Sequence, residues 1–238
     1  GNYCMIIASV IGSLFGPLIL IAYAKNDQEQ VKTITLDRSL SVGVMVAVMV
    51  GAIGGFSPVI LKIWLGIEFV DYNSWLLLKL SLIPFYSAAG VFAFTTRAWN
   101  KVRFPALVTV TLGLINLTVL YLIAKHADGD LSYVNLMLFI ALIMGIGQSY
   151  FLGGLYFSKF YEGTKQMVWT NFVKIFLTLF IVTGICFLIP YIFELHNILS
   201  LAIIGFVSLV LLVISLKITL NKKQHDAIIE LVYKSKIQ

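Results

Sequence analysis

The chain has 238 residues, of which 60% are hydrophobic and 12% charged, and its mean hydropathy is +0.96. These values exclude an ordinary soluble domain and indicate an integral membrane protein. The formal net charge of +6 does not indicate nucleic-acid binding, because most of the basic residues lie in short connections between apolar segments or in the C-terminal tail.

Seven apolar segments are long enough to cross a hydrocarbon layer of about 30 Å, which takes about 20 helical residues. They lack the alternating pattern of a membrane β-barrel, so the sequence predicts an all-α integral membrane bundle of about seven transmembrane helices. In chain order the predicted spans are Tyr3 to Ala24, Leu40 to Leu61, Trp75 to Thr96, Phe104 to Ala124, Leu131 to Phe157, Val168 to Phe193 and Ile198 to Leu220.

The second predicted span carries small residues at intervals of four, namely Gly43, Ala47, Gly51 and Gly55. This spacing places them along one side of a helix, where another helix can approach closely. The sequence predicts a tight helix contact here. A sliding seam between moving helices would use the same stripe, and this alternative stays open.

The third predicted span contains Pro84 about nine residues after Trp75, near the middle of the bilayer. Proline lacks a backbone donor, so we expect a kink and a freed carbonyl group at this depth. Interrupted membrane helices commonly line a cavity.

Four residues of the same span, Lys79, Tyr86, Gly90 and Arg97, are spaced by seven, four and seven. At about 100° per residue they fall within about 20° of one line along the helix. Lys79 and Arg97 would then lie about 27 Å apart, near opposite ends of one path for an anionic headgroup. The alternative is that both side chains only extend to the membrane interfaces.

The next three spans contain neutral polar residues at depth, namely Asn116, Gln148 and Asn171. Such side chains either hydrogen-bond a neighbouring helix or contact a sugar. Lys174, near the start of the sixth span, is expected to extend to the cytoplasmic face. Residues 221–238 form a basic amphipathic tail that is expected to lie on membrane lipid.

The acidic and histidine residues all lie outside the predicted spans, and no catalytic or metal-binding spacing is present. We therefore expect no enzyme activity, no metal site and no cofactor. An ion relay within this stretch also lacks the carboxylate that it would need.

Basic residues mark one side of the membrane. The connections after the first, third and fifth spans, together with the tail, hold 13 of the 17 lysines and arginines: Lys25, Lys32, Arg38, Arg97, Lys101, Arg103, Lys159, Lys165, Lys217, Lys222, Lys223, Lys234 and Lys236. The positive-inside tendency predicts a cytoplasmic C-terminus in the cell membrane. Gly1 then lies outside without an initiator methionine or signal peptide, so we expect a fragment of a longer protein.

Several short sequences resemble, in order and spacing, the second half of polysaccharide flippases in the multidrug/oligosaccharidyl-lipid/polysaccharide (MATE-like) transporter superfamily. They are Gly1-Asn2-Tyr3, Gly16-Pro17 ending a helix before a charged connection, Ser57-Pro58 followed by Ile63-Trp64-Leu65-Gly66, Asn100-Lys101-Val102-Arg103, and then Asn116. In that family two six-helix halves face each other around a cavity. The resemblance implies that residues 1–157 are five helices of the second half, that 158–220 are two appended helices, and that an N-terminal half is a missing partner.

The resemblance implies that this chain helps to flip a polyprenyl-pyrophosphate-linked oligosaccharide across the membrane for O-antigen, capsule or exopolysaccharide synthesis. Loading would start where Arg97, Lys101 and Arg103 attract the pyrophosphate. The candidate path residues are Lys79, Pro84, Tyr86, Gly90, Arg97, Asn100, Lys101, Arg103, Asn116 and Gln148. A drug exporter, a membrane glycan polymerase and a seven-helix receptor or light-driven protein are the open alternatives.

Overall fold

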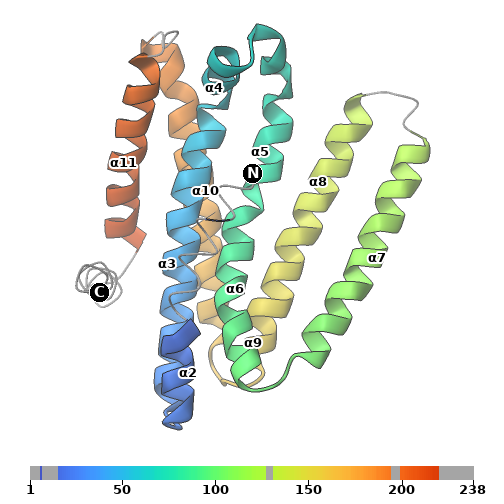
Figure 1. Ribbon diagram of the computed structural model, residues 1–238, viewed down its shortest axis with the longest axis vertical. Helices are drawn as coiled ribbons and strands as arrows, with labels where there is room; N and C mark the ends of the chain where they lie inside the picture. Colours follow the sequence, from blue (N-terminus) through green and yellow to red (C-terminus); the bar gives the residue numbers. More distant parts are fainter. Residues whose placement is uncertain (1–5, 7–15, 127–130, 194–198, 220–238) are drawn as a thin grey trace.

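A computed structural model describes residue 6 and residues 16–126, 131–193 and 199–219 (Figure 1). All regular elements in these ranges are helical, which confirms the predicted all-α membrane class. Their bounds are α2 Gly16–Ala24, α3 Gln28–Gly55, α4 Ser57–Trp64, η1 Ile67–Tyr72, α5 Asn73–Ser81, α6 Ile83–Ala98, α7 Arg103–Lys125, α8 Leu131–Gln148, the π-helix η2 Ser149–Leu155, α9 Tyr156–Ser158, α10 Lys165–Phe193 and α11 Leu199–Thr219.

Among these residues, five helical segments are long and apolar enough to cross a membrane: Gln28–Gly55, Ile67–Ala98, Arg103–Lys125, Ser132–Ser158 and Lys165–Pro190. They correspond to the second through sixth predicted spans. The seventh predicted span coincides with α11, which contains a shorter apolar segment, Ile203–Ser215. Most of the first predicted span and the whole tail, residues 221–238, lie outside the described residues.

The helix that contains most of the second predicted span differs from that span at both ends. Helix α3 begins at Gln28 rather than Leu40, because Asp27 caps it by accepting a hydrogen bond from the Gln30 backbone N–H at 2.9 Å. The expected charged connection is therefore mostly the first three turns of α3. At the other end α3 stops at Gly55, and the Ser57-Pro58 pair opens a separate helix, α4, because proline is suited to a first helical turn.

The Gly16-Pro17 pair was expected to end a helix. The structure instead places it at the first described residues of α2, which continues to Ala24. The reversal into α3 comes later, at Asn26, whose φ of 56° is in the left-handed region that asparagine tolerates.

The third predicted span divides into α5 and α6 at Leu82, two residues before Pro84. Pro84 occupies the first turn of α6, where its missing N–H costs no helical hydrogen bond. The interruption expected from the proline is confirmed.

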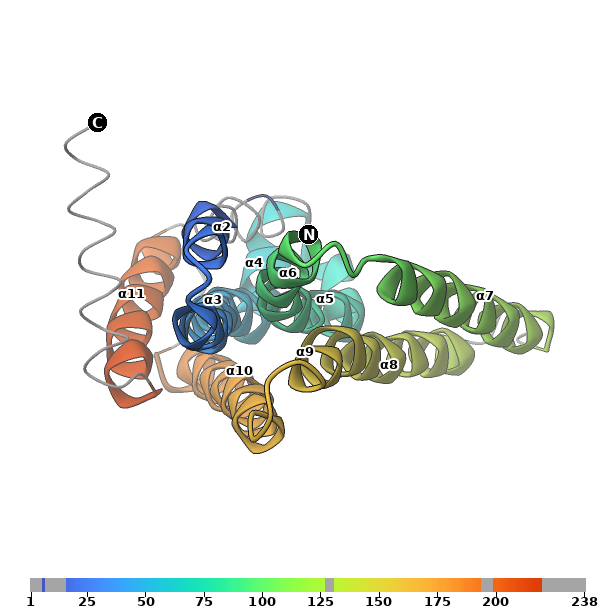
Figure 2. The same ribbon diagram turned by 90° about the horizontal axis from the view of Figure 1, so that it is seen from below.

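Helix α3 lies in the middle of the bundle and packs most extensively against α10 and α6 (Figure 2). The small-residue stripe of α3 faces α10, where a methyl group at Gly55 would lie 2.6 Å from the Thr183 carbonyl oxygen. A methyl group at Gly51 would lie 3.2 Å from the Leu179 carbonyl oxygen. The predicted tight contact is thus confirmed, and its partner is α10.

Polar side chains join these helices inside the core. The buried Thr35 and Thr95 hydroxyl groups share a hydrogen bond of 2.8 Å between α3 and α6. Asn171 of α10 donates its amide to the Leu36 carbonyl oxygen of α3 at 3.0 Å. Asn171 therefore makes an interhelical hydrogen bond, one of the two roles expected for it.

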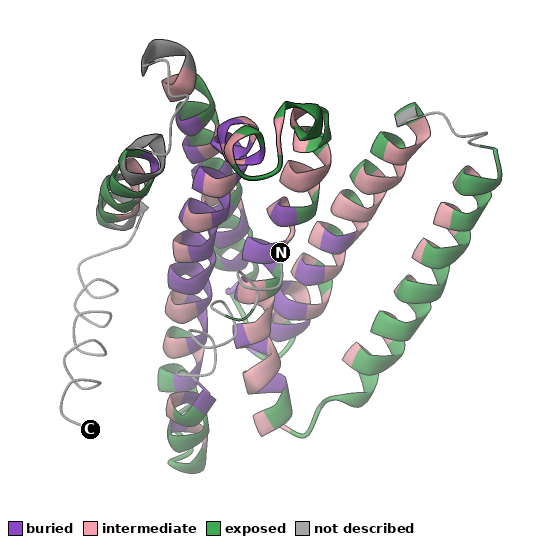
Figure 3. Ribbon diagram, turned by 45° about the horizontal axis from the view of Figure 1, so that its top comes forward, coloured by how far each residue is buried: buried purple, intermediate pink, exposed green. Residues whose placement is uncertain are grey.

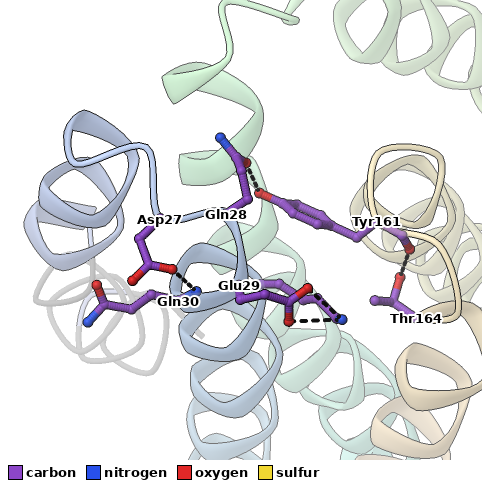
Figure 4. Close-up of polar contacts among 7 residues, drawn as sticks. Asp27, Gln28, Glu29, Gln30, Tyr161 and Thr164 are labelled. Carbon is purple, nitrogen blue, oxygen red and sulfur yellow. Dashed lines mark hydrogen bonds and ion pairs between the residues drawn. The ribbon is translucent and has the colours of Figure 1, made fainter.

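The connections alternate between two ends of the bundle. Those joining α2 to α3, α6 to α7 and α9 to α10 lie at one end, and α4, η1, the last turn of α7 and the first turn of α8 lie at the other (Figure 1). The described connections that are rich in lysine and arginine thus share one end. There Tyr161 donates its hydroxyl to Gln28 Oε1 at 2.8 Å, and burial, the largest cause, raises the pKa of Tyr161 (Figure 4).

Helix α7 is placed differently from the others. It lies at one edge of the bundle, with α8 as its main neighbour (Figure 2). None of its residues is buried, in contrast to the largely buried α3 (Figure 3). The side of α7 that faces away from α8 is therefore available to lipid or to further protein.

Candidate functional site

A groove of about 230 Å³ lies between α6, the first turns of α7 and the junction of α8 with η2. We call it the α6–α8 groove. Polar side chains from all three segments line it: Tyr86 and Thr96 from α6, Thr109 from α7, and Gln148 and Ser149 from the α8–η2 junction. No acidic or basic side chain belongs to this lining.

Small residues of α6 keep the groove open. Ala89, Gly90 and Ala93 lie along its wall, and a methyl group added at Gly90 would meet no atom within 4 Å. Gly153 of η2 permits the opposite wall to approach, because a methyl group there would lie 3.2 Å from the Ala89 Cα. The groove therefore exists because the α6 wall has small residues, and the helices themselves are not widely separated.

The groove contains three of the candidate path residues, Tyr86, Gly90 and Gln148, which come from segments about 60 residues apart. Lys79 is exposed on α5 outside the groove lining, and Pro84 is buried on the core side of α6. The predicted face of the third span is therefore divided between the groove and the outer surface.

Asn116 lies two turns beyond Thr109 on the same face of α7, about 10.5 Å further along the helix. Its side-chain oxygen is buried and has no hydrogen-bond partner among the described residues. It does not line the groove itself. Its amide thus lies on the extension of the groove wall formed by α7.

Basic side chains gather at one end of the groove. Arg97 follows the lining residue Thr96, Lys101 lies on the connection into α7, and Arg103 is the first residue of α7; all three side chains are exposed. The Arg97 guanidinium lies 5.6 Å from the centre of the Phe94 ring. These positive charges are close to the groove without being inside it.

The connection that carries these charges is held in place. Asn100 has a φ of 55°, and its N–H donates to the Arg97 carbonyl oxygen at 2.9 Å, which forms a tight turn. The Tyr156 hydroxyl donates to the Lys101 carbonyl oxygen at 3.3 Å. These hydrogen bonds therefore fix the backbone from which the Lys101 and Arg103 side chains extend.

Sequence reasoning missed Thr96, Thr109 and Ser149, whose hydroxyl groups bond carbonyl oxygens of their own helices. It also missed the π-helix η2, an element that is often found at functional sites. The Gly153-Gly154 pair was an available signal for this region, because adjacent glycines permit close backbone approach. The described residues include no cluster of three or more His, Cys, Asp or Glu side chains that could hold a metal ion.

No family model and no solved structure matches the chain. The chain is similar to the uncharacterized membrane protein EpsK of Bacillus subtilis (strain 168), with 26% identity over 145 residues. The match covers 58% of this chain and 27% of EpsK, so it spans about a quarter of that relative's length. The helical fold, the five apolar segments and this similarity show a multi-pass membrane protein.

Proposed function

We propose that this chain forms part of a transporter that flips a polyprenyl-pyrophosphate-linked oligosaccharide across the cell membrane for surface polysaccharide synthesis. The observation that carries the proposal is the α6–α8 groove, which has an uncharged lining that includes five polar side chains and a basic cluster, Arg97, Lys101 and Arg103, at one end. Hydroxyl, amide and aromatic side chains suit a sugar, whereas lysine and arginine suit a pyrophosphate.

The size of the groove supports a role as one wall of a larger path. A volume of about 230 Å³ is below the roughly 300–1,000 Å³ of a site that encloses a drug-sized ligand. Helix α7 contains no buried residue and contacts mainly α8, and Asn116 continues the polar wall beyond the groove. We infer that a segment outside this chain supplies the facing wall, in keeping with a match to only a quarter of its relative.

The charge of the site favours this substrate over a cationic drug. A drug exporter would need an anionic or strongly aromatic cavity, and no acidic side chain lines the α6–α8 groove. The basic cluster would instead repel a cation. In this proposal the basic end faces the cytoplasm, where the lipid-linked sugar is made and loaded.

The test replaces Lys101 and Arg103 together by glutamine. Loss of two charge-assisted hydrogen bonds to pyrophosphate is expected to slow transport at least about tenfold. The measurement is the fraction of lipid-linked oligosaccharide accessible at the outer leaflet of cells whose surface polysaccharide depends on this protein. Lys62→Gln is the control, because Lys62 is also exposed but lies on α4 at the other end. Unchanged transport in the double variant would refute the proposed loading site.

A further inference from the structure

A second groove, of about 650 Å³, lies between α3 and α10 at the end where both helices begin. We call it the α3–α10 groove, and it shares no lining residue with the α6–α8 groove. It differs from that groove in containing charges of both signs. The charged side chains in its lining are Glu29, Lys32 and Asp37 of α3 and Lys174 of α10.

The level of the groove relative to the membrane can be derived from the helix lengths. Asp37 and Lys174 each lie nine residues after the first residue of their helix, about 13.5 Å along it. The two helices have 28 and 29 residues, so they are about 42 and 44 Å long and exceed the hydrocarbon layer by about 12 to 14 Å. With their far ends at the opposite hydrocarbon boundary, Asp37 and Lys174 lie where hydrocarbon meets the headgroups.

One ion pair lies within this lining. Lys32 Nζ lies 3.2 Å from a Glu29 carboxylate oxygen (Figure 4). The half-buried Lys174 ammonium forms no salt bridge with any residue that the structure describes. The neighbouring Asn171 amide already donates a hydrogen bond to the Leu36 carbonyl oxygen. Lys174 is therefore the donor on the α10 side of the groove that we assign to a ligand.

We propose that the α3–α10 groove binds the headgroup of a zwitterionic phospholipid of the adjoining leaflet. The phosphate lies against Lys174, and the ethanolamine ammonium lies toward the carboxylates of Asp37 and Glu29. The lining holds two lysines and two carboxylates, so its formal charge is zero, which matches a zwitterionic headgroup better than an anionic one. The position at the headgroup boundary favours a membrane lipid over a soluble phosphate.

The experiment is native mass spectrometry of the purified protein with phosphatidylethanolamine and phosphatidylglycerol of identical acyl chains. The expected result is tighter binding of phosphatidylethanolamine by the unaltered protein. Lys174→Gln removes the phosphate partner and is expected to weaken that binding about tenfold. Lys62→Gln, which removes an exposed lysine far from the groove, is expected to leave it unchanged.

A second variant tests the charge argument without depending on Lys174. Asp37→Asn gives the lining a formal charge of +1, so the preference is expected to shift toward phosphatidylglycerol. The proposal is overturned if the unaltered protein prefers phosphatidylglycerol, if Asp37→Asn leaves the preference unchanged, or if Lys174→Gln binds as tightly as Lys62→Gln. Displacement of the lipid by soluble glycerophosphoethanolamine would also overturn it, because the groove would then take a soluble ligand.

Discussion

The α6–α8 groove is hollow because small residues of α6, such as Gly90, line it. Gly90 lines the groove together with Tyr86, and a methyl group added at Gly90 would meet no atom within 4 Å. A glycine at this point is not required by backbone conformation, because it lies within the regular helix α6. Its role in our proposal is to leave room for a ligand.

Gly90→Leu is therefore expected to fill the groove without disturbing the fold. Transport of the lipid-linked sugar should fall by about tenfold or more, which corresponds to about 1.4 kcal/mol of lost binding. The thermal midpoint of the purified variant should stay close to that of the unaltered protein. Gly205→Leu is the matched control, because Gly205 of α11 is also surrounded by open space and lies far from the groove. Equal transport by both variants would show that the groove is not on the path.

Asn171 illustrates how far sequence reasoning reaches for a single residue. A polar side chain inside an apolar span was expected to bond another helix or a sugar, and it donates to Leu36 of α3. The type of contact could be predicted because an amide in an apolar environment needs a partner. The identity of the partner could not, because Leu36 is 135 residues away in the chain.

At the scale of the elements, the contact between α3 and α10 is the most extensive in the bundle. Its closeness comes from the glycines of the α3 stripe, which let the two backbones approach. The sequence predicted the stripe, because its period of four matches one helix face. Which helix it meets depends on tertiary packing.

Gly55→Ala is expected to destabilise the protein by about 1–3 kcal/mol, because the added methyl group overpacks the contact. That methyl would lie 2.5 Å from the Cys186 Cβ and 2.6 Å from the Thr183 carbonyl oxygen. The free energy of unfolding in a detergent titration measures the effect. Gly184→Ala in α10 serves as control, since its added methyl group meets nothing within 4 Å. A similar stability for both variants would contradict the packing explanation.

At the scale of the whole molecule, the alternation of connections groups the described basic connections at one end of the bundle (Figure 1). The sequence alone assigned these residues to alternate connections, and the helical fold places those connections together. By the positive-inside tendency this end is expected in the cytoplasm.

Single cysteines test this orientation in a variant that lacks Cys4 and Cys186. Lys159→Cys lies in the α9–α10 connection and Asp71→Cys lies in η1 at the other end; both positions are exposed. A membrane-impermeable maleimide should label Asp71→Cys in intact cells and Lys159→Cys only after permeabilisation. The reverse pattern would place the basic end outside and would contradict cytoplasmic loading.

The sequence by itself determined the membrane class, the positions of most spans, the break near Pro84 and the stripe of small residues. Each of these depends on hydropathy or backbone chemistry along one helix, so neighbouring residues suffice to predict it. The start of α3 was missed because charged residues looked like a loop, although the Asp27 cap extends the helix through them. Only the tertiary structure decided that Gln148 shares a groove with Tyr86 and that Lys174 shares a groove with Asp37. Those pairs lie far apart in the chain, and side-chain packing between helices, rather than any local pattern, brings them together.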